Sequence, residues 1–206
     1  TVMILGFGTQ TLDADLDGWP DLIQTNGHID TYDGVPFGYE MQPQFFRNEG
    51  QGKFKELPAS VLGPFFAGKY LGRGLARIDW NKDGLEDVAI SHIDVPAAVL
   101  TNTTPATGQF LAISLRGTKS ARDALGTVVK VKTGGQTLVR QLTGGDGYQA
   151  SNERVLYFGL GDQSEVEEVE IRWPNGETQA LPKQGAGQSL LVIEGRSEPV
   201  LLWKKG

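Results

Sequence analysis

The sequence contains no cysteine and only two histidines, His28 and His92, among its 206 residues. Without cysteine, the chain can form no disulfide, offers no thiolate to a metal and has no cysteine nucleophile. Two histidines are too few for a poly-histidine zinc centre, and they leave few general bases for chemistry near neutral pH. These absences argue against thiol-dependent and zinc-dependent enzymes.

Long apolar runs and basic clusters are also absent. No apolar segment approaches the roughly 18 residues that cross a bilayer. No block rich in Lys and Arg is present to bind phosphates, and the chain has a net charge of −6, from 25 acidic and 19 basic side chains. We therefore predict neither a membrane span nor a nucleic-acid partner.

The negative charge is concentrated in the first half of the chain. Residues 1–105 contain 14 acidic and 7 basic side chains, a net charge of −7. Residues 106–206 contain 11 acidic and 12 basic side chains, a net charge of +1. This asymmetry predicts two unlike halves, each of a size suited to a small domain.

An internal repeat occupies the first half. Residues 6–21 align without gaps on residues 72–87, at a constant offset of 66. Each copy begins with Gly-x-Gly, continues into an acidic loop and leads into a short apolar run, with no helical period. Between the copies, residues 45–54 have the pattern of a strand, a Gly-rich turn and a second strand. The repeat unit is therefore predicted to be a small group of β-strands, as in propeller blades or a solenoid.

The second half has a different pattern. Short segments with period-two alternation, such as 129–132 and 166–171, are separated by Gly-Gly pairs. Residues 173–177 contain Asn175-Gly176, which favours a hairpin with a two-residue primed turn, because that turn needs positive φ angles. Strands at this spacing predict a compact β-sandwich or barrel.

The predicted fold class is all-β: two β-propeller-type blades, a partial propeller, followed by a small β-sandwich or barrel. Residues 1–105 would form the blades, and residues 106–196 the second domain. Residues 102–108 are a plausible linker. The tail, 197–206, is either a docking strand or a disordered end, and the sequence leaves both open.

Acidic side chains concentrate in two nine-residue loops. Residues 13–21 place Asp at positions 1, 3, 5 and 9 and Gly18 at position 6; residues 79–87 match, with Asn81 at position 3. Calcium prefers six to eight oxygen ligands, and a tight loop presents alternate side chains inward together with the carbonyl of position 7. We predict two Ca²⁺ sites. Their ligands would be Asp13, Asp15, Asp17, Asp21 and the carbonyl of Trp19, and then Asp79, Asn81, Asp83, Asp87 and the carbonyl of Leu85.

Ordinary turn chemistry is the alternative explanation, because Asp and Gly are common in polar turns. These 18 residues, however, hold seven of the 13 Asp of the chain, where even scatter would give about one. Carboxylates crowded into one turn also repel one another without a cation. An EF-hand is disfavoured, because it needs helical flanks and Glu at position 12, where Gln24 and Ile90 stand.

Other polar and aromatic residues have structural explanations. His28 and His92 are predicted to pack or form hydrogen bonds at strand ends. No Ser-His-Asp arrangement can be assembled, and a glycosidase would need other acids, such as Glu40 and Glu56. We therefore predict no catalytic residues.

The motifs resemble known families. The repeat units at 6–21 and 72–87, with 46–54 between them, resemble FG-GAP (VCBS-type) repeats, which form blades of calcium-binding propellers in integrin α-chains and bacterial surface proteins. The second half is similar to the UnbV/ASPIC domain of cartilage-acidic-protein-like proteins, although Ala121 stands where that family usually has Asn. The strings that support this similarity are 115–118, 120–126, 145–148, 158–161 and 172–176.

The resemblance implies a non-enzymatic, calcium-binding interaction or adhesion module, extracellular, on the cell surface or in the periplasm, with a protein or glycan partner. One alternative is a subunit or fragment of a carbohydrate-active or other propeller enzyme whose active site lies outside this chain. Another is a carbohydrate-binding module that uses exposed aromatic residues such as Tyr148 or Trp173.

Propellers close with about four to eight blades, and this sequence contains only two repeats. We therefore expect a piece of a longer precursor, or another chain that completes the propeller. Thr1 in place of an initiator Met agrees with trimming.

Overall fold

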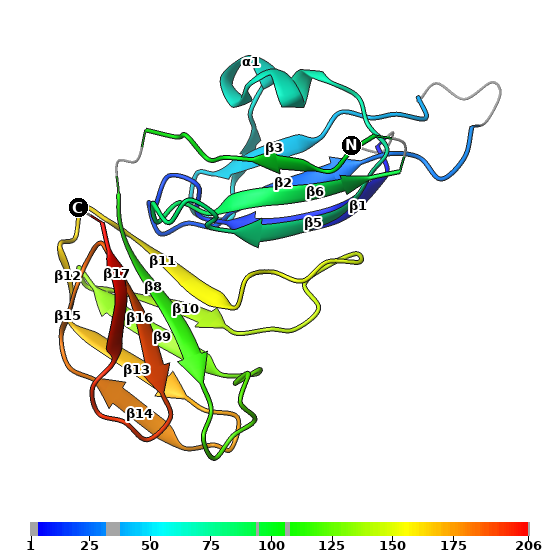
Figure 1. The fold of residues 1–206 in the computed structure, drawn as a ribbon. Helices are drawn as coiled ribbons and strands as arrows, with labels where there is room; N and C mark the ends of the chain where they lie inside the picture. The colour runs from blue at the N-terminus through cyan, green and yellow to red at the C-terminus, as the bar shows by residue number, and fades with distance from the viewer. Residues whose placement is uncertain (1–3, 32–37, 94, 106–107, 206) are drawn as a thin grey trace.

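The computed structural model describes residues 4–31, 38–93, 95–105 and 108–205, and its regular structure is nearly all β-strand (Figure 1). The predicted all-β fold class with propeller-like blades is confirmed. None of the helices in the described ranges is long and apolar enough to cross a membrane. The elements are β1 (Gly6–Leu12), β2 (Asp21–Asn26), β3 (Gln44–Asn48), β4 (Phe54–Glu56), α1 (Ala59–Leu62), the 3-10 helix η1 (Pro64–Ala67), β5 (Gly72–Ile78), β6 (Asp87–His92), β7 (Ala98–Leu100), β8 (Gln109–Arg116), β9 (Val128–Thr133), β10 (Gln136–Gln141), β11 (Val155–Gly161), β12 (Glu165–Val166), β13 (Glu168–Arg172), β14 (Thr178–Leu181), β15 (Gln184–Gly185), β16 (Gln188–Ile193) and β17 (Val200–Lys204).

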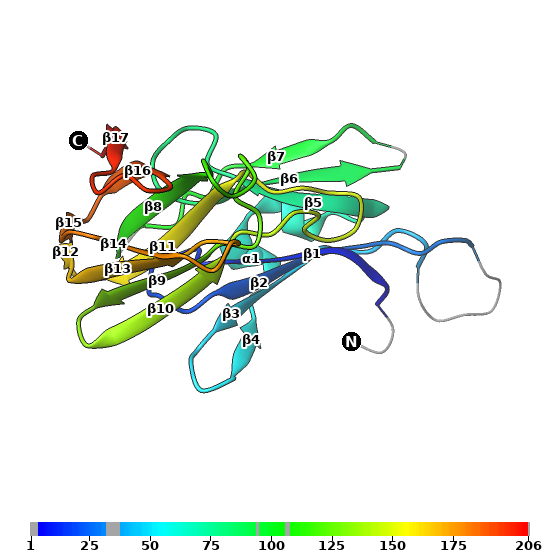
Figure 2. The same cartoon turned by 90° about the horizontal axis from the view of Figure 1, so that it is seen from below.

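Two antiparallel meanders form the first half, with strand orders β1-β2-β3-β4 and β5-β6-β7 (Figure 2). The strand, turn and strand predicted over 45–54 are β3 and β4. The first strands of the two sheets, β1 and β5, pack against each other. They point the same way, so the loops that follow them lie at the same end of the sheets (Figure 1). Inward-facing side chains such as Leu12, Ile23, Leu75 and Ile90 form the core between the sheets.

The two sequence repeats are structurally equivalent. In the first sheet the register of β1 with β2 shifts between the pair Gly6–Asn26 and the pair Thr9–Gln24. In the second sheet the register of β5 with β6 shifts between the pair Gly72–His92 and the pair Leu75–Ile90. Each residue of the second set lies 66 positions after its counterpart. The same irregularity therefore occurs twice, at the start of the first strand of each sheet.

Two four-stranded sheets face each other in the second half, with orders β10-β9-β13-β14 and β11-β8-β16-β17. β16 pairs with β8 in parallel, and β12 with β15 forms a small separate sheet. Between the large sheets lies an apolar core that includes Phe158, Val131 and Trp173. Trp173 is 2% exposed, so the alternative in which it is an exposed sugar-binding residue is wrong.

The C-terminal tail is a strand. β17 pairs antiparallel with β16 and forms one edge of its sheet, which decides between the two alternatives for residues 197–206. Its Leu201 and Leu202 remain exposed. The predicted linker includes residues 106–107, which lie outside the described residues.

The hairpin predicted at Asn175-Gly176 is present, but its turn is wider than expected. Trp173 and Glu177 close it, with the Trp173 N–H donating to the Glu177 carbonyl at 2.9 Å. Of the two central residues only Gly176 has a positive φ, at 90°. Primed turns need a positive φ at the first central residue, here Asn175, so the predicted two-residue primed turn is wrong. The Asn175 side chain instead accepts the Glu177 N–H and donates to Glu194.

Glu194 is a buried carboxylate that organises one end of this domain. Oε2 accepts the N–H groups of Thr118, Lys119 and Ser120 at 2.7–2.8 Å, and Oε1 accepts the Ser120 hydroxyl and the Asn175 amide. Burial would raise the pKa of this carboxyl, but these hydrogen bonds outweigh it and lower the pKa to about 2. The ionised form is therefore the one that holds the loop at 117–120.

We expect Glu194→Gln to destabilise the protein by on the order of 3 kcal/mol at pH 7, because backbone donors lose a charged acceptor. Because folding depresses the pKa of Glu194, its stabilisation is complete above its ordinary value of 4.5 and is lost as pH falls towards about 2. Urea unfolding at pH 7 and pH 3 measures both effects. The exposed Glu198→Gln is the control, and an equal loss in the two variants would contradict the role of Glu194.

Candidate metal centre

The two acidic loops have the same backbone conformation. Leu16 and Lys82, at position 4, have φ angles of 59° and 57°, and Gly18 and Gly84, at position 6, have φ angles of 91° and 88°. Left-handed backbone at a non-glycine residue is uncommon and costs free energy, so its occurrence at equivalent positions marks one specific loop structure. β-Strands flank both loops. The exclusion of an EF-hand is therefore confirmed.

Carboxylates at positions 1 and 5 hold each loop closed. In both copies the first accepts the N–H of position 6 and the second accepts the N–H of position 7. The bonds are Asp13–Gly18 at 2.9 Å, Asp17–Trp19 at 2.8 Å, Asp79–Gly84 at 3.0 Å and Asp83–Leu85 at 2.9 Å. These bonds turn the position-1 and position-5 carboxylates towards the inside of the loop.

The carboxylate at position 9 ties each loop to a neighbouring segment. Asp21 accepts the N–H of Ala14 at 3.2 Å and that of Asn48 at 2.8 Å. Asp87 does the same with Trp80 at 3.2 Å and Asn102 at 2.7 Å. Both oxygens of each carboxylate therefore already accept a backbone N–H.

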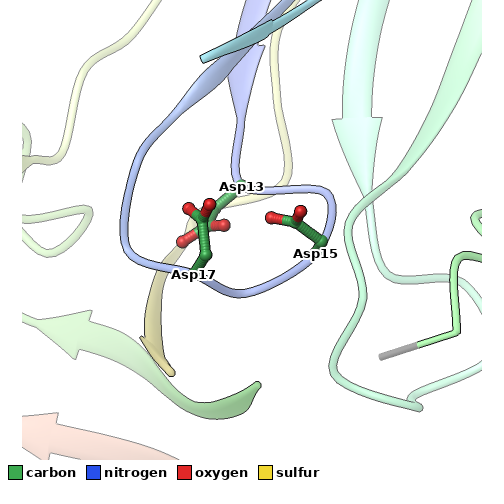
Figure 3. A group of neighbouring side chains, drawn as sticks. All are labelled: Asp13, Asp15 and Asp17. Carbon is green, nitrogen blue, oxygen red and sulfur yellow. The ribbon is translucent and has the colours of Figure 1, made fainter. Parts of the chain in front are cut away.

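The structure brings three predicted ligands together. One carboxylate oxygen from each of Asp13, Asp15 and Asp17 lies within 4.8 Å of the other two. Figure 3 shows Asp15 pointing across the loop towards Asp13 and Asp17. Asp21 lies outside this group. The Arg47 guanidinium contacts the group of three from outside the loop and donates to Asp15 Oδ2 at 2.6 Å.

The second loop is arranged differently. Its carboxylates do not form such a group among the residues that the structure describes. Both oxygens of Asp79 accept backbone N–H groups, and the Asn81 amide donates to Asp83 Oδ2 at 2.8 Å. More of the side-chain oxygens in the second loop therefore accept hydrogen bonds from within the loop than in the first loop.

Asp13 is the most constrained of the predicted ligands. It is 3% exposed, and its Oδ1 is buried without a hydrogen-bond partner in the described part of the chain. Burial raises the pKa of Asp13 to about 7; the Gly18 N–H opposes this shift, and the charges of Asp17 and Asp15 add to it. A buried carboxylate oxygen without a partner costs free energy, which a bound cation would offset.

Burial also raises the pKa of four other predicted ligands. It raises that of Asp21 to about 6, against the opposing N–H groups of Asn48 and Ala14. The pKa values of Asp17, Asp79 and Asp87 are raised for the same reason. Hard, partly desolvated carboxylate oxygens are a donor set that suits calcium. The first loop fits this ion best, because it combines the gathered oxygens with the unpartnered Asp13 Oδ1.

A group of buried and half-buried charges lies beside this site and is not among the predicted ligands, apart from Asp13. Glu86 is 5% exposed and pairs with the half-buried Arg77 at 2.7 Å. Glu86, Arg77, Asp13 and the half-buried Arg140 line a cavity of about 400 Å³ between the blades and the second domain. The repeat alignment contains a signal for the pair, because Arg77 and Glu86 replace Thr11 and Pro20 of the first copy. Arg140 lies outside every motif, so no comparable signal exists for it.

The two histidines form the strand-end contacts expected of them. His28 Nδ1 accepts the Asp30 N–H at 3.3 Å. His92 Nδ1 lies 3.0 Å from the Pro96 carbonyl oxygen, and its ring packs against Tyr70 at an interplanar angle of 35°, with 5.0 Å between centroids.

Glu40 and Glu56, the acids that a glycosidase would need, line one cavity of about 540 Å³ beside α1. No residue of β1 or β5, the strands at the blade interface, contributes to its described walls. Glu56 accepts a hydrogen bond from Gln44 at 2.8 Å.

Residues 117–199 match the family model described as ASPIC and UnbV. This match confirms the UnbV/ASPIC part of the resemblance. The FG-GAP part, which concerns the first half of the chain, stays a prediction.

Cartilage acidic protein 1 from mouse and from human are both 32% identical to this chain over 138 residues, covering 63% of it. The protein of the same name from Xenopus tropicalis is 34% identical over 110 residues, covering 51%. The chain spans only 16–20% of the length of these relatives. A solved structure from Bacteroides ovatus, of a protein assigned to cell adhesion, aligns over 97% of this chain and 85% of its own. Its TM-score of 0.30 and identity of 13% are too low to support an argument.

We expect Asp13→Asn to change the stability of the protein in opposite directions with and without calcium. In chelator at pH 7.5, the variant should be more stable by about 1–2 kcal/mol, because a buried charge is removed and the new amide can donate to its acidic neighbours. In millimolar calcium it should be less stable than the wild type, because a charged ligand is lost.

Thermal unfolding under the two conditions measures both differences. The exposed Asp123→Asn is the control and should change neither. A difference of the same sign under both conditions would contradict a cation site at Asp13.

Proposed function

We propose that this chain is a calcium-stabilised, non-enzymatic interaction module that acts outside the cell or at its surface. The single observation that supports calcium most directly is Asp13, a buried carboxylate with an unpartnered oxygen inside a group of three gathered carboxylates. The equivalent backbone of the two loops supports a shared role for both.

The first loop would hold its ion more tightly than the second. Its predicted ligands include four carboxylates, and Asp13 Oδ1 gains a partner when a cation binds. Those of the second loop include three carboxylates and the Asn81 amide, and calcium would have to replace the Asn81–Asp83 hydrogen bond. The ion would be held by Asp13, Asp15, Asp17, Asp21 and the Trp19 carbonyl in the first loop, and by Asp79, Asn81, Asp83, Asp87 and the Leu85 carbonyl in the second.

When bound, calcium would cancel the repulsion between carboxylates and fix the ends of β1 and β5 relative to β2 and β6. Extracellular calcium modules commonly bind with dissociation constants of about 10⁻⁴–10⁻³ M, which suits a protein outside the cytosol. This chemistry supports the proposed location.

The partner would be a protein or a glycan at the cell surface. The blades in this chain are too few to close a propeller by themselves. We propose that further blades, from a longer polypeptide or from a second chain, complete it. The relatives, of which this chain spans about a fifth at most, are long enough to contain such blades.

Calcium should raise the melting temperature of the wild-type chain, and chelation should reverse the change. A ligand at 100 times its dissociation constant stabilises the folded state by about 2.7 kcal/mol, which corresponds to roughly 5–10 °C for a chain of this size. Asp17→Asn should lose most of this shift, because it keeps an oxygen for the Trp19 N–H but removes the charge.

Differential scanning fluorimetry and calcium titration calorimetry measure the effect. Asp123→Asn is again the control, and magnesium should substitute poorly because it demands octahedral geometry. Wild-type protein that shows neither a thermal shift nor binding heat with calcium would overturn the proposed function.

A further inference from the structure

The two acidic loops form the surface on which the second domain sits. In Figure 1 the loop ends of the blades face the sheet that contains β8 and β11. A buried cluster joins the two parts there: Leu16 from the first loop and Leu85 from the second contact Phe110, Ala112 and Tyr157. The residues at this contact therefore come from inside the predicted calcium loops.

The backbone of β11 lies directly on the first loop. Gly161 donates its N–H to the Leu16 carbonyl at 2.8 Å. A Cβ atom on Gly159 would collide with Asp13 Oδ2 and would lie 2.7 Å from the Leu16 backbone. Asp13, the carboxylate with the unpartnered oxygen, is thus packed beneath a strand of the other domain.

The second loop makes equivalent contacts. A Cβ atom on Gly84 would collide with the Phe110 ring. The Tyr157 hydroxyl donates to Asp79 Oδ2 at 3.4 Å, and Glu153 Oε2 accepts the Asp79 N–H at 3.0 Å. The position-1 carboxylates of both loops therefore touch the second domain.

We propose that calcium binding at these loops and docking of the second domain onto the blades are thermodynamically coupled. The inference rests on the proposed function, because it requires calcium at the loops. Docking buries Asp13 beneath Gly159 and withdraws it from water, so the docked state gains more from a cation than an undocked state does. Calcium in turn fixes the left-handed Leu16 and the Gly18 turn, which present the Leu16 carbonyl to Gly161.

Coupling between two binding events is reciprocal. If calcium strengthens docking by a given factor, docking strengthens calcium binding by the same factor. A substitution that loosens the docked state without altering any proposed ligand should therefore weaken calcium binding.

Asn152→Ala in the full chain is such a substitution, because the Asn152 side chain accepts the Arg77 N–H and donates to Gln10 across the contact, and neither partner is a proposed ligand. We expect titration calorimetry to show calcium binding weakened at least threefold. The matched control is Gln136→Ala, an exposed amide side chain in β10 of the second domain, which should bind like the wild type. Wild-type affinity in Asn152→Ala would overturn the coupling and leave the proposed function intact. An absence of calcium binding in the wild type would overturn both.

Hydrogen exchange on the wild-type chain tests the coupling without a variant. The Gly161 amide donates across the interface, whereas the Val131 amide lies within the second domain's own sheet. Chelation should reduce the protection of the Gly161 amide at least tenfold and leave that of Val131 unchanged. Equal protection of Gly161 with and without calcium, in protein shown to bind calcium, would overturn the coupling.

Discussion

The burial of Asp13 is the constraint on which the arrangement of the two halves depends. Its carboxylate closes the first loop through the Gly18 N–H, and it lies beneath Gly159 of the other domain with one oxygen unpartnered in the described chain. An aspartate in a solvated turn would pay no desolvation free energy, because water would bind both carboxylate oxygens. Here Oδ2 lies against the Gly159 backbone and Oδ1 is buried without a hydrogen-bond partner among the described residues, which makes a cation a chemically suitable partner.

The repeat shows how two copies of one unit diverge once they occupy different places. Both loops keep the left-handed residue at position 4 and the same four kinds of hydrogen bond. The second copy adds the Arg77–Glu86 ion pair, and its Asn81 amide donates a hydrogen bond to Asp83 within the loop. Its interface contact uses Tyr157 and Glu153 on Asp79, whereas in the first copy the glycine backbone of β11 lies against Asp13. The first loop therefore gains more from a bound ion than the second.

Local patterns predicted much of the fold. The period-two alternation, the Gly-rich turns and the 66-residue offset suffice for an all-β chain with repeated units, and the comparisons support the UnbV/ASPIC part of the second half. Two expectations differ from the structure. The turn at Asn175-Gly176 is closed by Trp173 and Glu177, and the Asn175 side chain accepts the Glu177 N–H and donates to Glu194. Trp173 packs in the core because β-strands from the whole domain surround it.

The sequence by itself determined the identity and spacing of the candidate ligands, since a Gly at position 6 and alternate Asp residues specify a tight acidic loop through local sterics and hydrogen bonds. Only the tertiary structure decided which carboxylates gather, which oxygen lacks a partner, and that Arg140, Tyr157 and Gly159 from the second half surround them. These properties depend on burial. Burial is set by segments more than 50 residues away in the chain, which no local pattern encodes.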